Sequence, residues 1–273
     1  MVSVGLFDVI DEITEKQIMK TETGDNRMFG VMVGTVAKNY DKDMPGRVCV
    51  TIPVRDADAN ELKWARVAML SHGKKWGHYF QPEIGDQVLL AFEQGNIEKP
   101  YVIGCVAKDS NKFLKDAVDE KNQHKKIVTK NGNAIIFEDN AEGEGEKDKI
   151  TIQTANKEHS LLLDNENHKI VISDKEKKNA IEMKTENGHM KIQAETKLVI
   201  EVGDNIKLTL NGNNGGVTLE CSKLTMKTTG NTTIEATGGF KATGSNVTLD
   251  ATSLLKANSS GASIIGGTPI KIG

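Results

Sequence analysis

The sequence predicts an all-β protein with an N-terminal OB-fold barrel followed by an intertwined trimeric β-helix, or β-prism, spike. Three observations predict this fold. Nine of the twelve aromatic residues lie between Phe29 and Phe113. The same window holds four of the five prolines, with short apolar runs between turns. The following ~160 residues almost lack rings and alternate apolar with polar residues, which is typical of strands rather than of an ordinary core.

Residues 29–106 are expected to form the barrel. Turn residues such as those of Asp43–Gly46 and Pro82–Asp86 separate its strands. Five short strands in about 78 residues suit a small closed barrel. Trp64 is expected to fill the barrel interior; a stacking platform on the barrel surface is the alternative. The expected strands are Val31–Ala37, Arg47–Val54, Trp64–Met69, Gln87–Phe92 and Tyr101–Val106.

Residues 1–28 form an N-terminal amphipathic segment. Apolar residues recur at helical spacing, which predicts a short helix over 6–20. A helix this short is marginal alone, so we expect it to dock on a partner; a frayed terminus is the alternative. The apolar residues expected to contact this partner are Leu6, Val9, Ile10 and Ile13. Residues 107–126 are polar and predict a linker with one helical turn around 112–118.

Residues 127–273 are expected to form the spike. Alternating segments of residues separated by turns such as Asn131–Gly132 lead into a Gly- and Thr-rich tract after about Glu201. There, Phe240, Val247 and Leu254 are seven residues apart, a spacing typical of solenoids. Each strand has too little apolar surface for a core of its own. Three chains could enclose one apolar axis, so the sequence predicts a homotrimer.

Charge and composition exclude several function classes. The net charge is −3, which argues against recruitment by nucleic acid or an anionic membrane. No run of 18 apolar residues could span a membrane, and no basic leader marks a signal peptide, so export is expected to use another machine. The cysteines Cys49, Cys105 and Cys221 are far apart and are expected to be free thiols.

No residue is predicted to be catalytic, to bind a cofactor or to ligate a metal. The six histidines are dispersed, without an HxH or HExxH pattern. The acidic stretch Glu138–Asp148 offers carboxylates to a hard cation but lacks the ligand order of an EF-hand, which favours a solvated loop. No GxSxG, P-loop or GxGxxG motif is present, so we expect no enzyme.

The turn and strand motifs together carry a resemblance. Their order is Gly34–Ala37 with Asp41–Val48, Trp64–Ala68, Pro82–Phe92 and Pro100–Gly104, and then Lys125–Asp139. The first five segments resemble the OB domain of the VgrG and phage baseplate-spike family, which includes gpV-like spikes. The last resembles the segment where that family's β-helix begins. Only 28 residues precede Phe29 and about 20 separate barrel from spike, so the resemblance is to a short form without a fused hub or lysozyme domain.

This resemblance implies the central spike of a contractile injection system: a phage tail, a tailocin, an extracellular injection system or a type VI-like apparatus. The homotrimer would dock on the hub of the tube and pierce the target envelope, touching the membrane transiently, with effector cargo as a further partner. It would assemble in the cytoplasm, join a baseplate or virion-like particle, and be ejected to the extracellular space or the target envelope.

The resemblance also implies a PAAR-type protein on the apolar end of the spike. Alternatively, these end residues close the trimer axis themselves. They are Ile264, Ile265, Pro269, Ile270 and Ile272.

Two other functions remain open. One is an OB-fold ligand-binding module with a solenoid extension, binding single-stranded nucleic acid or sugar through Lys74–Trp76 and Tyr79–Phe80. The other is a phage tail spike that degrades surface glycan. The negative net charge weighs against the first. A thin three-chain rod offers few concave pockets for the second.

Overall fold

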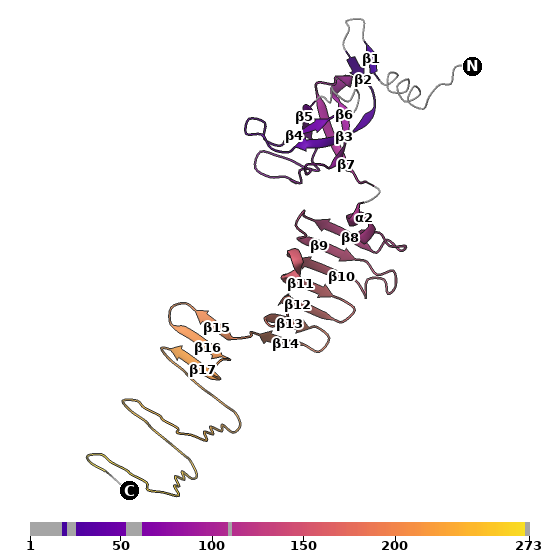
Figure 1. Cartoon of the computed structure of the whole chain (residues 1–273). Helices are drawn as coiled ribbons and strands as arrows, with labels where there is room; N and C mark the ends of the chain where they lie inside the picture. The colour runs from indigo at the N-terminus through magenta and orange to yellow at the C-terminus, as the bar shows by residue number, and fades with distance from the viewer. Residues whose placement is uncertain (1–17, 21–25, 53–61, 109–110, 271–273) are drawn as a thin grey trace. The chain divides into compact units, whose positions relative to one another are not determined.

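The computed structural model describes residues 18–20, 26–52, 62–108 and 111–270 (Figure 1). Their regular structure is β apart from one helix and two short 3-10 turns, which confirms the predicted all-β class. The strands form a two-stranded pair, a closed barrel, a seven-stranded sheet and a three-stranded sheet. Most of the helix predicted over 6–20 lies outside the described residues. Its last three residues, Ile18–Lys20, are instead strand β1.

The predicted barrel is a closed sheet of five strands in the order β3-β4-β5-β7-β6. Its strands are β3 Val31–Lys38, β4 Arg47–Thr51, β5 Leu62–Val67, β6 Gln87–Phe92 and β7 Pro100–Val106. Strands β5 and β7 pair in parallel, and the other neighbours pair antiparallel. The 3-10 turn η1 Glu93–Gly95 joins β6 to β7. Strand β1 pairs with β2 Asn26–Met28 before the barrel begins.

Alternating residues of these strands fill the barrel. In β6, Val88, Leu90 and Phe92 are buried and the residues between them are half-buried. Gly34 lets β3 pass close to its neighbours: a Cβ there would lie 2.7 Å from Cδ1 of Leu90 and 2.9 Å from the backbone oxygen of Thr51. The core consists of Met28, Val36, Val48, Val50, Ile52, Ala65, Val88, Leu90, Phe92 and Val102. The barrel therefore has an apolar core of its own.

Trp64 does not fill the barrel, so that prediction is wrong. Its neighbour Ala65 is fully buried in the core, while Trp64 is half-buried. Successive side chains of a strand point to opposite faces, so one strand cannot place both residues inside. The sequence predicted the strand but assigned the ring to the wrong face.

Seven antiparallel strands form a meander after the barrel. Each strand pairs with the next in sequence, so neighbours along the chain are neighbours in the sheet (Figure 1). The strands are β8 His124–Val128, β9 Ala134–Glu138, β10 Lys149–Gln153, β11 His159–Asp164, β12 Lys169–Asp174, β13 Ala180–Lys184 and β14 His189–Gln193. The 3-10 turn η2 Ala155–Lys157 lies between β10 and β11. The sheet begins at His124, three residues before the predicted start at 127.

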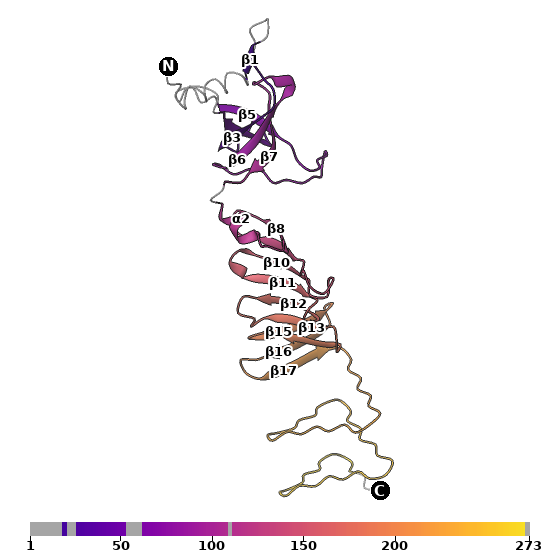
Figure 2. The same cartoon turned by 90° about the vertical axis from the view of Figure 1, so that its right-hand side faces the viewer.

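The chain divides into two compact units, the second running from Val199 onwards apart from the turn at Gly212–Asn214. A three-stranded sheet contributes to this second unit, with strands β15 Lys197–Val202, β16 Ile206–Asn211 and β17 Gly216–Cys221. Residues 222–270 contain no helix or strand and run as extended chain with sharp bends (Figure 2). We call residues 222–270 the tail.

Candidate assembly interface

One face of the seven-stranded sheet is apolar across all its strands. Neighbouring side chains of a strand point to opposite faces, so the register assigns every residue to one of two faces. Lys125 is the single polar residue in the two central register rows of this face, which we call the apolar face. One row is Ile127, Ile135, Ile152, Leu161, Ile172, Ile181 and Ile192, and the other is Lys125, Phe137, Ile150, Leu163, Ile170, Met183 and Met190.

The opposite face of the sheet, which we call the polar face, carries most of the charged residues and also three half-buried aliphatic ones, Ile136, Leu162 and Val171. Lys149 on this face pairs with Glu166, and the hydroxyls of Ser160 and Ser173 lie 3.4 Å apart. Two of its register rows are His124, Glu138, Lys149, Asp164, Lys169, Lys184 and His189, and Lys126, Ile136, Thr151, Leu162, Val171, Glu182 and Lys191. The charged side chains of this face are suited to contact with water.

Asp164 is the buried carboxylate of the polar face. Burial acts to raise the pKa of Asp164, but hydrogen bonds from Asn167, together with the charges of Lys149 and Lys169, lower it overall. The backbone N–H and the side-chain amide of Asn167 donate to its two oxygens at 3.0 and 2.9 Å. The carboxylate therefore stays charged and fixes the turn between β11 and β12.

The apolar face is the more exposed of the two. Ile152 and Ile172 are 45% and 48% exposed, whereas Asp164 and Ser173 on the polar face are 5% and 7% exposed. An antiparallel sheet with one solvated face has the reverse arrangement, with its apolar side covered. A continuous exposed apolar surface of this kind marks an interaction site. Within the first unit the apolar side chains of this face stay largely exposed, as Ile127, Ile181 and Ile192 also show.

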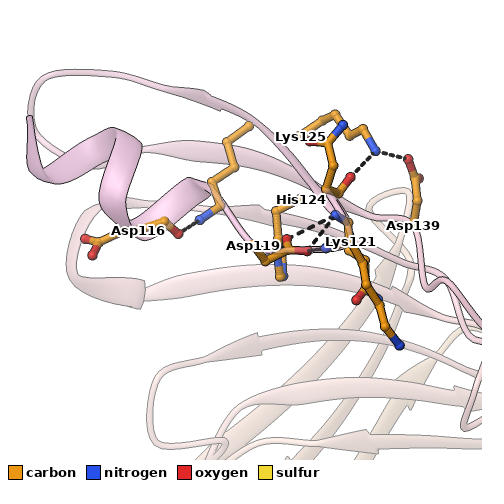
Figure 3. A network of polar contacts seen from close by, with 9 residues as sticks. Asp116, Asp119, Lys121, His124, Lys125 and Asp139 are labelled. Atoms are coloured by element: carbon orange, nitrogen blue, oxygen red, sulfur yellow. Dashed lines mark hydrogen bonds and ion pairs between the residues drawn. The ribbon is translucent and has the colours of Figure 1, made fainter. Parts of the chain in front are cut away.

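A helix and a polar turn close the β8 edge of this sheet (Figure 3). Helix α2 Lys112–Ala117 lies on the chain just before β8, and the ammonium of Lys126 donates to the backbone oxygen of Asp116 at 2.7 Å. The carboxylate of Asp119 accepts hydrogen bonds from the backbone N–H groups of Lys121 and Gln123 and contacts Nδ1 of His124 at 2.9 Å. The helix and the turn therefore lie beside β8, at one end of the sheet.

The hydrogen bond from His124, followed by that from the N–H of Gln123, lowers the pKa of the Asp119 carboxyl. A lowered pKa means that the folded chain favours the charged carboxylate. The predicted helical turn around 112–118 is confirmed by α2, and Asn111 caps it by accepting from the N–H of Phe113. The segment predicted as a linker thus contains a short helix and a hydrogen-bonded turn.

The three-stranded sheet has the same two-faced pattern. Leu208 pairs with Leu219 and Leu210 pairs with Val217, all on one face. The intervening pair Thr209 and Thr218 lies on the other face. Val217 and Leu219 are exposed. This sheet, taken alone, also presents an uncovered apolar side.

The tail exposes both its apolar side chains and its backbone. No backbone-to-backbone hydrogen bond joins residues within the described tail. Extended backbone groups need partners when apolar side chains beside them are withdrawn from water. The tail's large apolar residues are all exposed: Leu224, Met226, Ile234, Phe240, Val247, Leu249, Leu254, Leu255, Ile264, Ile265 and Ile270. Pairing with strands of another chain would satisfy both needs.

The barrel is similar in sequence to a domain of known proteins. Residues 32–106 match the family model of the type VI secretion system and phage-baseplate injector OB domain. This match extends over the barrel and not over the rest of the chain. The resemblance to VgrG and baseplate spikes predicted from the barrel motifs is confirmed over these residues.

Three type VI secretion system spike proteins of Pseudomonas aeruginosa are similar to part of the chain. VgrG5 is 33% identical over 85 residues, covering 30% of this chain and 11% of VgrG5. VgrG2a and VgrG2b are each 31% identical over 91 residues, covering 32% of this chain and 11% and 9% of their own lengths. The similarity to these spikes therefore spans about a tenth of each relative.

The residues predicted to bind a tip protein lie at the end of the tail. Ile264, Ile265, Pro269 and Ile270 are exposed, Ile264 at 92%. Ile272 lies outside the described residues. So do the four residues predicted to contact the hub: Leu6, Val9, Ile10 and Ile13.

Within the described ranges, no group of His, Cys, Asp and Glu has an arrangement that could hold a metal ion. The acidic stretch Glu138–Asp148 mainly forms the connection between β9 and β10, where Lys147 pairs with Glu142 at 3.2 Å.

The three cysteines are free, as predicted, and burial raises the pKa of the Cys49 and Cys105 thiols. No helix in the described part of the chain is long and apolar enough to cross a membrane.

Sequence reasoning missed a polar cleft on the barrel surface. Its walls include Arg47, Arg66 and Tyr101, which come from three different strands. Arg47 and Arg66 are 19 positions apart in sequence, and only the register of β4 against β5 makes them neighbours. No local spacing signal could have joined them.

Proposed function

We propose that this chain is the central spike of a contractile injection system, acting as a homotrimer. The observation that carries the proposal is an injector OB domain followed by a sheet whose apolar face is more exposed than its polar face. Spike proteins are also the relatives to which the barrel is similar. The spike has a structural role and no enzymatic one.

Burial of the apolar face between copies supports an oligomer. Full burial of a large aliphatic side chain contributes about 1.5–3 kcal/mol relative to leaving it exposed. The apolar face holds many such side chains in unbroken rows, so its burial between copies of the chain would be strongly favourable. The polar faces would remain in water on the outside.

The tail supports three copies rather than two. Its extended segments carry one or two apolar residues per seven or eight, as Phe240, Val247 and Leu254 show. In a dimer, two seven-stranded sheets could cover each other's apolar faces. Two tails, however, would have too few apolar residues to form a core between them. Three tails wound together enclose an apolar axis and pair their backbones with one another.

The two ends of the trimer have different partners in this proposal. The barrels, with the N-terminal segment containing Leu6, Val9, Ile10 and Ile13, dock on the hub of the tube. The apolar end formed by Ile264, Ile265, Pro269, Ile270 and Ile272 binds a PAAR-type tip protein. The spike assembles with its baseplate inside the producing cell, is ejected on contraction, and touches the target membrane transiently with any effector cargo.

Replacement of Ile152 by glutamate tests the function. Ile152 lies on the apolar face, and a buried charge without a partner destabilises an interface by several kcal/mol, so Ile152→Glu should abolish assembly of injection particles. Thr151→Glu is the matched control, since Thr151 is the adjacent residue on the polar face. Each variant would replace the native gene in the producing strain, with killing or injection of target cells as the readout. Wild-type injection by the Ile152→Glu strain would refute the proposal.

A further inference from the structure

A cleft of about 410 Å³ lies on the outer surface of the barrel. Arg47 of β4 and Arg66 of β5 are direct cross-strand partners, and Arg66 is next to Tyr101 of β7. The residues that line the cleft are Arg47, Trp64, Arg66, Glu93, Glu98, Lys99, Pro100 and Tyr101. Three strands and the connection between β6 and β7 therefore place two guanidinium groups and two aromatic rings around one hollow.

Both carboxylates of the cleft already have cationic partners. The hydroxyl of Tyr101 donates to Oε2 of Glu93 at 2.9 Å, and the ammonium of Lys99 donates to Oε1 at 3.2 Å. These two hydrogen bonds lower the pKa of the Glu93 carboxyl, so it stays charged. The ammonium of Lys63 contacts both oxygens of Glu98, at 2.8 and 2.7 Å. Neither carboxylate is within salt-bridge distance of the two arginines.

The two arginines are the cations of the cleft without a salt bridge, and the charge of Arg66 acts on Glu93 only at longer range, where it helps to lower the pKa of that carboxyl. No ion pair joins either of them to a carboxylate in the described part of the chain, and Arg47 has no side-chain hydrogen bond there. Arg66 reaches only Tyr101, with Nη1 3.4 Å from the hydroxyl and the guanidinium 6.0 Å from the ring centre. Like charges directly opposite each other destabilise a strand pair. An anion between Arg47 and Arg66 would remove this repulsion.

We propose that this cleft binds a carboxylate side chain from an acidic peptide segment of a partner protein. The planar forks of Arg47 and Arg66 can each donate two N–H groups to a carboxylate. The rings of Trp64 and Tyr101 would pack against the aliphatic stem of the bound side chain. This role also accounts for the position of Trp64 on the outside of the barrel.

The surroundings favour a peptide over nucleic acid. Glu93 and Glu98 stand in the cleft wall and would repel the successive phosphates of a polyanion. The chain's net charge of −3 adds no attraction for phosphate backbones. A single carboxylate between the arginines avoids this repulsion. The proposal concerns the barrel alone and does not depend on the proposed function.

Binding of a labelled acidic peptide to the full-length protein tests the proposal. The probe is a fluorescein-labelled Ser and Gly peptide with one central Glu, followed by anisotropy, and the same peptide with Gln in place of Glu is its uncharged counterpart. In a Trp76→Phe background Trp64 is the remaining tryptophan, so its fluorescence locates binding to the cleft. We expect the Glu peptide to bind and change this fluorescence, and the Gln peptide to do neither.

Arginine substitutions complete the test. Arg47→Gln and Arg66→Gln should each weaken peptide binding by about tenfold, because each removes a charge-assisted donor pair. The matched control Lys42→Gln removes an exposed cation of the barrel outside the cleft and should change binding by less than about twofold. Equal binding of the two peptides, or unchanged binding after both arginine substitutions, would overturn the proposal. So would stronger competition by single-stranded oligo-dT or inorganic phosphate than by unlabelled Glu peptide.

Discussion

Asp119 fixes the covered edge of the seven-stranded sheet through one carboxylate. Its two oxygens hold the backbone of the turn before β8 and the ring of His124 (Figure 3). An open β8 would offer its N–H and C=O groups to other chains, in competition with assembly through the apolar face. A single side chain therefore helps to determine which surface of the sheet is available.

Asp119→Asn should loosen this edge, with faster amide hydrogen exchange in β8 and a lower thermal midpoint at neutral pH. The hydrogen bonds lower the pKa of the carboxyl, so its stabilising contribution is complete above the ordinary aspartate pKa of about 4 and is lost as the pH falls through the lowered value. The difference between the variant and the wild type should therefore disappear in acid.

Asp116→Asn is the control for this prediction. Asp116 accepts from Lys126 through its backbone oxygen, which the substitution leaves in place. Its exchange rates in β8 should match those of the wild type. Equal effects of the two substitutions, or a difference from wild type that grows on acidification, would contradict the role of the Asp119 carboxylate.

At the scale of elements, much of the fold could be predicted from the sequence. The five barrel strands were found with ends within three residues, because alternation and turn residues are local signals. Strand β6, Gln87–Phe92, was predicted to the residue. The helical turn α2 was found as well. The fold class followed from such patterns, without any knowledge of contacts between distant residues.

The candidate sites were predictable only in part. Alternation shows that Ile152 and Thr151 lie on opposite faces, but not that the face of Ile152 is left uncovered. The cleft of Arg47 and Arg66 depends on the register between strands, which a single strand's pattern does not contain. Trp64 was assigned to the wrong face because a large ring suggested a core position. The exposed apolar face and the arginine cleft could therefore be found only from the structure, because they depend on solvent exposure and on the register between strands.

The end of the tail is a separate functional element in this account. Deletion of Ile264–Gly273 should abolish co-purification with a PAAR-type tip protein while leaving the trimer intact. The apolar face and the rest of the tail remain in the truncated chain, so the association of copies should persist. Pull-down of the tip protein, with the mass of the complex measured alongside, checks both parts. Retention of the tip protein by the truncated chain would show that it binds elsewhere.

At the scale of the whole molecule, the parts differ in how far one chain can stabilise them. The barrel buries Val48, Leu90 and Val102 in a core of its own. The seven-stranded sheet completes its backbone pairing but leaves the apolar face open. The described residues of the tail have neither paired backbones nor buried apolar side chains. In the proposed trimer, the dependence on other copies would therefore increase from the barrel to the tail.

The central claim is that three copies bury the apolar face and the tail. Light scattering of the purified full-length protein after size exclusion measures the number of copies directly. The account predicts three chain masses for the wild type and for Thr151→Glu, and a loss of the trimer for Ile152→Glu. A stable monomer of the wild type at micromolar concentration, or a trimer unaffected by Ile152→Glu, would contradict it.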